Sequence, residues 1–178
     1  PNHHVFGLSL VMSRGQTLFV ADTAVHEVLS ALQMADIAEQ AAKVARSLGH
    51  EPRVALISYS NFGHPALPRA EVVRDAVKLL DERQVGFEYE GEMTIEVALN
   101  EEIKRNYPFC RLTGPANVLI MPSLLTSQVS TQLLLEEGGG TVLGPVLMGL
   151  SKPAQIVPMG TTVSDMVNMT ALAAQGAN

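Results

Sequence analysis

The chain has 178 residues and a formal net charge of −6, and no basic run is visible, which argues against binding to nucleic acid or to an anionic membrane surface. Its apolar stretches are shorter than a bilayer span, and no secretory pattern is present. The single cysteine, Cys110, excludes an internal disulfide and fits a reducing cytosol. These features predict a cytoplasmic protein whose length suits one domain, or one domain plus part of another. The chain starts at Pro1, almost inside a strand pattern, which suggests a piece of a longer polypeptide.

The first elements along the chain are predicted to be two strands and a helix. Alternating, β-rich residues at 5–12 and 17–21 are separated by the turn signal Arg14-Gly15, which predicts a hairpin. Ser30 followed by Gln33 has the spacing of a capping box, and helical periodicity continues behind it as far as Gly49.

Strands and helices then alternate to the end of the chain. The apolar runs at 54–58, 85–89, 118–121 and 141–143 predict strands, and the stripes between them predict helices. Thr162, with Asp165 three residues on, is expected to cap a last helix that ends near residue 174. This order predicts an α/β fold with three layers, in which a mostly parallel sheet has helices on both faces.

Ligands of open α/β sheets lie beyond the carboxyl ends of the strands. In this chain the rule marks the segments 58–65, 90–93, 122–127 and 144–153. The loop at 58–65 offers hydroxyls, an amide and a glycine, groups that can hold phosphate or amide oxygens, although an ordinary polar loop has the same composition.

Several catalytic and metal-binding motifs are missing from the sequence. There is no phosphate-gripping glycine motif, and the glycines at 138–140 follow a helix and predict a turn. Ser58 and Ser60 do not sit in a GxSxG elbow, and none of the five histidines has a spacing typical of zinc, so no metal site is expected. Asp165 is either a capping carboxylate or a base that faces the cleft.

Short motifs in chain order resemble those of phosphate acetyltransferases. They are ADTAVH at 21–26, ADIA at 35–38, EPRVALISYS at 51–60, EGEM at 90–93, EVAL at 96–99, GPVLMG at 144–149, KP at 152–153 and SDMV at 164–167. Two variants, SNFG at 60–63 and GPVLMG, resemble the form of this domain that is fused behind bacterial NADP-dependent malic enzymes. The resemblance implies an isocitrate dehydrogenase-like α/β fold with the CoA cleft between two subdomains.

The resemblance also implies that acetyl transfer is lost. Working family members carry LSRG before the last helix, whereas this chain has Val157, Pro158, Met159 and Gly160. Met159 cannot stabilise a phosphoryl anion as the family arginine would. Asp165 matches the family base position and would then be vestigial, and the segment 123–130 also departs from the family pattern.

By the same resemblance, residues 1–155 would form the second subdomain, and the helix within 156–178 would return toward an absent first one. Acetyl-CoA is expected as an effector, the parent chain's malic-enzyme domain and further copies of the chain (at least a dimer) as partners, and NADP and divalent metal only in the absent upstream domain. The residues expected to bind acetyl-CoA are Ser58, Ser60, Asn61, Phe62, Gly63, Pro145, Met148, Gly149, Lys152 and Pro153. An active acyltransferase and a purely structural assembly module remain alternatives.

Overall fold

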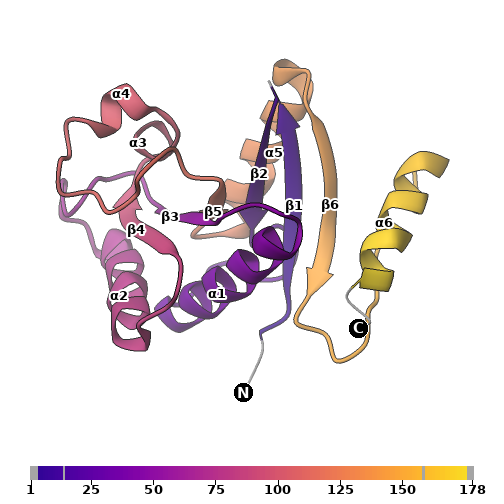
Figure 1. The fold of residues 1–178 in the computed structure, drawn as a ribbon, viewed down its shortest axis with the longest axis horizontal. Helices are drawn as coiled ribbons and strands as arrows, with labels where there is room; N and C mark the ends of the chain where they lie inside the picture. The colour runs from indigo at the N-terminus through magenta and orange to yellow at the C-terminus, as the bar shows by residue number, and fades with distance from the viewer. Residues whose placement is uncertain (1–3, 14, 158, 176–178) are drawn as a thin grey trace.

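One six-stranded sheet organises the computed structural model, which describes residues 4–13, 15–157 and 159–175 (Figure 1). The strands are β1 (Phe6–Ser13), β2 (Gln16–Ala21), β3 (Arg53–Ile57), β4 (Glu88–Met93), β5 (Val118–Ile120) and β6 (Thr141–Met148). Their order across the sheet is β4-β3-β5-β2-β1-β6. Only β1 runs against the others, so the predicted mostly parallel sheet with an amino-terminal hairpin is confirmed.

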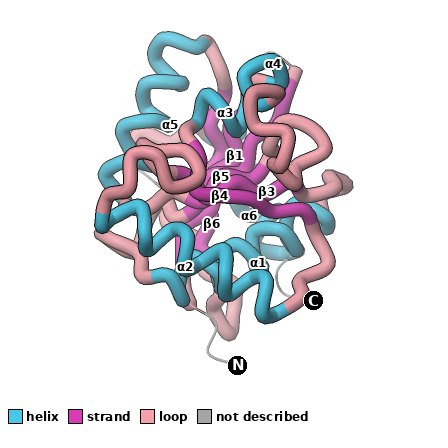
Figure 2. Tube along the Cα trace, turned by 90° about the vertical axis from the view of Figure 1, so that its left-hand side faces the viewer, coloured by secondary structure: helices cyan, strands magenta, loops and turns pink. Residues whose placement is uncertain are grey.

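Helices cover both faces of this sheet, as the alternating pattern predicts. They are α1 (Ala31–Ser47), α2 (Pro68–Arg83), α3 (Ile95–Leu99), α4 (Glu101–Lys104), α5 (Leu124–Gly138) and α6 (Val163–Gln175). Figure 2 shows α1 and α2 on one side of the sheet and α3, α4 and α5 on the other. The buried side of α1 carries five alanines, which let this helix approach the sheet closely (Ala35, Ala38, Ala41, Ala42 and Ala45).

The side chains of β1 alternate between the hydrophobic cores on the two faces of the sheet. Phe6, Leu8 and Leu10 point into the core shared with α1 and α2, whereas Val11 belongs to the core on the opposite face. Successive residues of a strand point to opposite faces, so the predicted period of two is the physical cause of this division.

The helix caps follow the sequence closely. Ser30 and Gln33 form the predicted capping box at the start of α1, and Thr162 caps the start of α6 through the Asp165 N–H at 3.2 Å. The predicted helical stripe at 95–103 is divided, because Asn100 ends α3 and its side chain accepts the N–H groups that start α4. Among the described residues, no helix is both long and apolar enough to cross a bilayer.

Two segments that the sequence placed in loops belong to strands. β4 begins at Glu88 and continues to Met93, so Glu90, Gly91 and Met93 pair with β3, whereas Glu92 lies at a register shift. β6 continues past the predicted end at residue 143 to Met148, because β1 pairs with residues 146–148 as well as with residues 141–143, on the two sides of a register shift. Pro145 is tolerated there because β6 is an edge strand.

Candidate functional site

The centre of the carboxyl edge is a turn built around Asp22, which follows β2. The Asp22 side chain is buried, and Oδ1 accepts the N–H groups of Gly7 and Ala24 at 2.8 Å and of Val25 at 3.1 Å. Oδ2 accepts the His26 N–H at 2.8 Å and lies 2.7 Å from Nδ1 of the same residue. One carboxylate therefore holds the turn and the start of β1 together.

His26 continues this network toward the amino-terminal segment. The His26 and His4 rings lie edge to face with their centroids 6.2 Å apart, and His4 Nε2 is 3.1 Å from Asp36 Oδ2. Arg83 of α2 pairs with Asp36, with Nη1 2.7 Å from Oδ1, and so joins α2 to α1. The spacing of the histidines gave no sign of this arrangement, although residues 21–26 and 35–38 both belong to motifs of the resemblance.

The loop after β3 is anchored by a buried carboxylate from β4. Ser60 donates its hydroxyl hydrogen to Glu92 Oε1 at 2.5 Å, and the Gly63 N–H reaches the same oxygen at 3.2 Å. Arg74 of α2 pairs with Glu92 Oε2 at 2.7 Å, and the Ser58 hydroxyl lies 3.3 Å from that of Ser60. The hydroxyl hydrogen of Ser60 is therefore already used in a hydrogen bond within the protein.

Asn61 and Phe62 also have partners within the chain. The Asn61 side-chain oxygen accepts the Thr94 N–H at 2.7 Å, so this amide holds the loop against the start of α3. Phe62 adopts a φ of 50°, and its ring packs against Tyr107 and Phe109 with centroids 5.0 and 4.9 Å away. The loop expected to bind a ligand is built mainly from contacts that fix its own shape.

The second half of the predicted site follows β6. Pro145 and Met148 lie in that strand, whereas Lys152 and Pro153 follow it and are exposed. Both halves are at the same edge of the sheet, but four strand spacings separate β3 from β6, or roughly 19 Å. Only an extended ligand could touch both.

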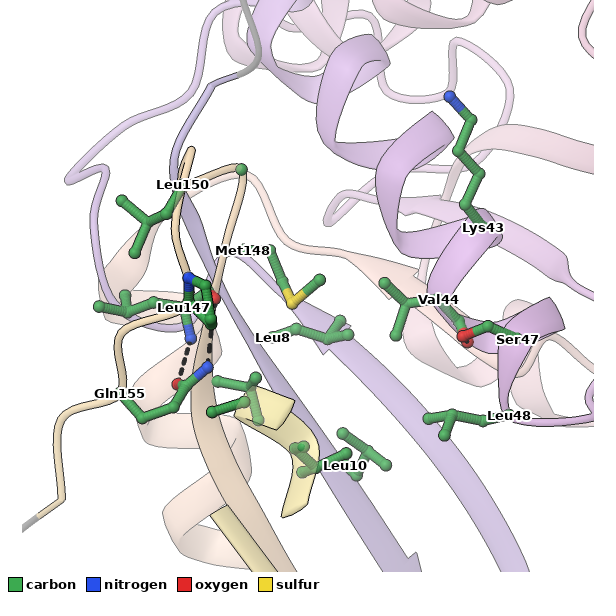
Figure 3. A pocket seen from close by; sticks show the side chains of 15 residues that line it. Leu8, Leu10, Lys43, Val44, Ser47, Leu48, Leu147, Met148, Leu150 and Gln155 are labelled. Atoms are coloured by element: carbon green, nitrogen blue, oxygen red, sulfur yellow. Dashed lines mark hydrogen bonds between the residues drawn. The ribbon is translucent and has the colours of Figure 1, made fainter. Parts of the chain in front are cut away.

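A groove of about 310 Å³ opens beside the end of β6 (Figure 3). Its floor is apolar and comes from β1, β6, α1 and α6, with Leu8, Leu10, Val44, Leu48, Met148 and Leu172 among its lining residues. Lys43 and Ser47 stand at the rim on α1, and Gln155 braces the opposite wall by accepting the Leu147 N–H at 2.8 Å. Three predicted residues, Met148, Gly149 and Pro153, line this groove, and sequence reasoning missed Lys43 because α1 is distant in the chain.

Gly149 has a structural reason to be glycine. Its φ is +78°, and a Cβ at this position would lie 2.3 Å from the His4 carbonyl oxygen. The left-handed backbone and the close approach of the amino-terminal segment therefore both require the absence of a side chain.

The residues before α6 form the cap of that helix. Asp165 accepts the Thr162 hydroxyl at 2.6 Å, so its carboxylate acts in the cap of α6. Met159 is fully exposed, and Pro158 lies outside the described residues. Within the described part of the chain, no group of three or more His, Cys, Asp or Glu side chains is arranged to hold a metal ion.

A family model described as phosphate acetyl/butaryl transferase matches residues 1–174. The chain belongs to this family. The fold agrees, because a phosphotransacetylase from Staphylococcus aureus superposes with a TM-score of 0.89 at 28% identity, covering 96% of this chain and 53% of that one.

Two longer proteins are also similar to the chain. An NADP-dependent malic enzyme of Rhizobium meliloti is 53% identical over 177 residues, or 99% of this chain and 23% of that protein. A phosphate acetyltransferase of Paracoccus denitrificans is 39% identical and covers 90% of this chain and 51% of its own length. The chain thus spans about a quarter of the malic enzyme and half of the acetyltransferase, and the resemblance to both groups is confirmed.

Proposed function

We propose that this chain is the acetyl-CoA-sensing, carboxyl-terminal domain of a cytoplasmic NADP-dependent malic enzyme, which converts malate to pyruvate and CO2. The observation that carries the proposal is the 53% identity to the Rhizobium meliloti malic enzyme over 99% of the chain. In this proposal NADP, malate and a divalent metal bind to an upstream domain. Residues 156–178 then return toward a first subdomain, which the exposed Val163, Met166 and Val167 of α6 favour.

We further propose that the domain does not transfer acetyl groups. Met159 replaces the arginine of the family motif and extends into solvent, where it can neutralise no phosphoryl charge. The Asp165 carboxylate is engaged by the Thr162 hydroxyl in the helix cap. The similarity to the Paracoccus denitrificans phosphate acetyltransferase favours the alternative, an active acyltransferase, and an assay of acetyl phosphate formation separates the two.

The groove beside β6 is the place in which we expect acetyl-CoA to bind. Its apolar floor suits the pantetheine and acetyl portions, and Lys43 at its rim with Lys152 behind β6 offers cations to the phosphates. The anchored loop at Ser58, Ser60, Asn61, Phe62 and Gly63 would contact only the far end of an extended ligand. Binding regulates the enzyme only if acetyl-CoA favours one of two conformations of the protein. In this proposal the two conformations belong to an assembly of several copies of the chain.

Calorimetry with acetyl-CoA on the full-length protein tests this site. The double substitution Lys43→Ala and Lys152→Ala is expected to weaken binding at least about 100-fold, because each of the two lost charge-assisted contacts costs about 1.5–3 kcal/mol. Lys78→Ala is the matched control, since Lys78 is an exposed lysine of α2 paired with Asp75. Unchanged affinity in the double variant would exclude the groove, and absence of any binding would leave the domain as an assembly module.

A further inference from the structure

The side chain of Gln155 occupies the free edge of β6 beside the groove (Figure 3). Its Oε1 accepts the Leu147 N–H at 2.8 Å, and its Nε2 donates to the Leu147 carbonyl oxygen at 3.4 Å. One side-chain amide thus bonds both backbone groups of a single residue, which is the pairing that a neighbouring strand supplies in a sheet. Gln155 therefore takes the place of a strand at this point of the sheet edge.

A short stretch of this edge is suited to such pairing. β6 is the last strand of the sheet, and the Leu147 N–H and carbonyl both point away from β1. Two residues earlier, Pro145 has no N–H to donate. A complete strand from another protein would meet this gap in the ladder, whereas a ligand with one residue-like unit needs only the pair at Leu147.

The segment that carries Gln155 can release its side chain at low cost. Residues 149–157 form no helix or strand, and Gln155 is half-buried. Ala154 and Ile156, on its two sides, are exposed, so moving the segment uncovers little apolar surface. A displaced glutamine amide bonds to water, which offsets most of the two hydrogen bonds that it gives up.

The pantetheine arm of acetyl-CoA carries groups that match the Leu147 pair. Its β-alanine unit has an N–H and a carbonyl like those of a peptide residue, with an extra methylene between them. A chain that lies one strand spacing of about 4.8 Å from β6 can bond both backbone groups of Leu147 through this unit. Leu147 and Gln155 line the same groove as the apolar floor and Lys43, so an arm in this place adjoins both.

We propose that the pantetheine arm of acetyl-CoA binds as a short added strand on β6, with its β-alanine unit paired to Leu147 in place of the Gln155 side chain. The inference rests on the proposed function, because it takes the groove as the acetyl-CoA site. Gln155 is then an internal competitor that fills the pairing position until the ligand arrives. The affinity for acetyl-CoA is therefore set in part by a residue that the bound ligand displaces.

Calorimetry with acetyl-CoA on the full-length protein tests the competition. Gln155→Ala is expected to bind acetyl-CoA about two- to tenfold more tightly than the native protein, because the ligand no longer displaces a net hydrogen bond. Gln16→Ala is the matched control and should leave the affinity unchanged. Gln16 is exposed and pairs with Ser13, at the far end of β1 from the Gly7–Leu147 pair beside the groove. Equal or weaker binding by Gln155→Ala would overturn the competition.

Hydrogen exchange of the Leu147 N–H tests the pairing itself, by mass spectrometry with fragmentation to single residues. In Gln155→Ala this N–H should exchange faster than in the native protein, and saturating acetyl-CoA should slow the exchange again. Acetyl-pantetheine 4′-phosphate, which lacks the nucleotide, should protect the same N–H when bound, because the arm alone makes the pair. Fast exchange that persists with either ligand bound would contradict the arrangement.

The two measurements separate this inference from the proposed function. If acetyl-CoA binds the native protein but Gln155→Ala does not bind it more tightly, or Leu147 is not protected, the pairing is wrong and acetyl-CoA sensing stands. If acetyl-CoA gives no heat of binding with the native protein or with Gln155→Ala, both the pairing and the sensing role are wrong.

Discussion

The Ser60 hydroxyl donates a 2.5 Å hydrogen bond to Glu92, whose carboxylate is completely buried at the end of β4. Arg74 pairs with the other carboxylate oxygen at 2.7 Å. The same acid therefore joins the loop after β3, the strand β4 and the helix α2. A loop that the sequence marks as a binding loop owes its shape to an internal ion pair.

Replacing Glu92 by alanine is expected to lower the free energy of unfolding by about 3 kcal/mol. The substitution leaves the Arg74 guanidinium and the Ser60 hydroxyl without their partner, and the loss of one member of a buried pair costs this much. Urea denaturation followed by circular dichroism measures the change. Glu82→Ala on the exposed side of α2 is the control and should change stability by less than about 0.5 kcal/mol, as is usual for a surface substitution.

Asp22→Ala is expected to destabilise the chain by more than about 3 kcal/mol. The change leaves four backbone N–H groups and the His26 ring without the acceptor they share, and each unsatisfied donor costs about 1–3 kcal/mol when it stays buried. Asp75→Ala, at a solvent-exposed position of α2, is the comparison. If thermal unfolding showed equal losses for the two variants, the Asp22 turn would not be a structural anchor.

Tyr89 predicts a loss of stability at alkaline pH. Burial and a hydrogen bond from its hydroxyl to Asp81 raise the pKa of Tyr89 to about 12. Because the folded pKa lies above the unfolded value of about 10, its contribution is complete below pH 10 and is lost as the pH rises toward 12. Urea midpoints of the native chain and Tyr89→Phe should therefore converge between pH 9 and pH 12.

Acetyl transfer provides a direct test of the lost arginine. The chain, given acetyl-CoA and phosphate, is expected to release CoA at far less than about 1 per second, an ordinary enzymatic rate. Met159→Arg restores the cation of the family motif, and any gain in rate from this variant would support our reading of the motif. A native turnover at ordinary rates, measured as free thiol, would refute the proposal that catalysis is lost.

The local elements of the fold were predictable because they depend on neighbours in the chain. Ser30 and Gln33 form their capping box within one helical turn, and the hairpin of β1 and β2 needs only alternation and a short turn. The family itself was recognisable from motifs such as residues 51–60. The ends of β4 and β6 were not, because each strand continues only where β3 or β1 offers a partner to pair with.

The site depended on contacts between residues far apart in the sequence. No spacing in the sequence joins Ser60 to Glu92 or brings Lys43 to the groove beside Met148. Helix α5 is a further case, because Ser127 and Thr131 are buried whereas Leu125 and Leu133 are exposed, which only the structure shows. The sequence by itself determined the elements, their order and the family, since these follow from local periodicity and motifs. Which face of each element is buried, and which side chains meet, was decided only by tertiary packing.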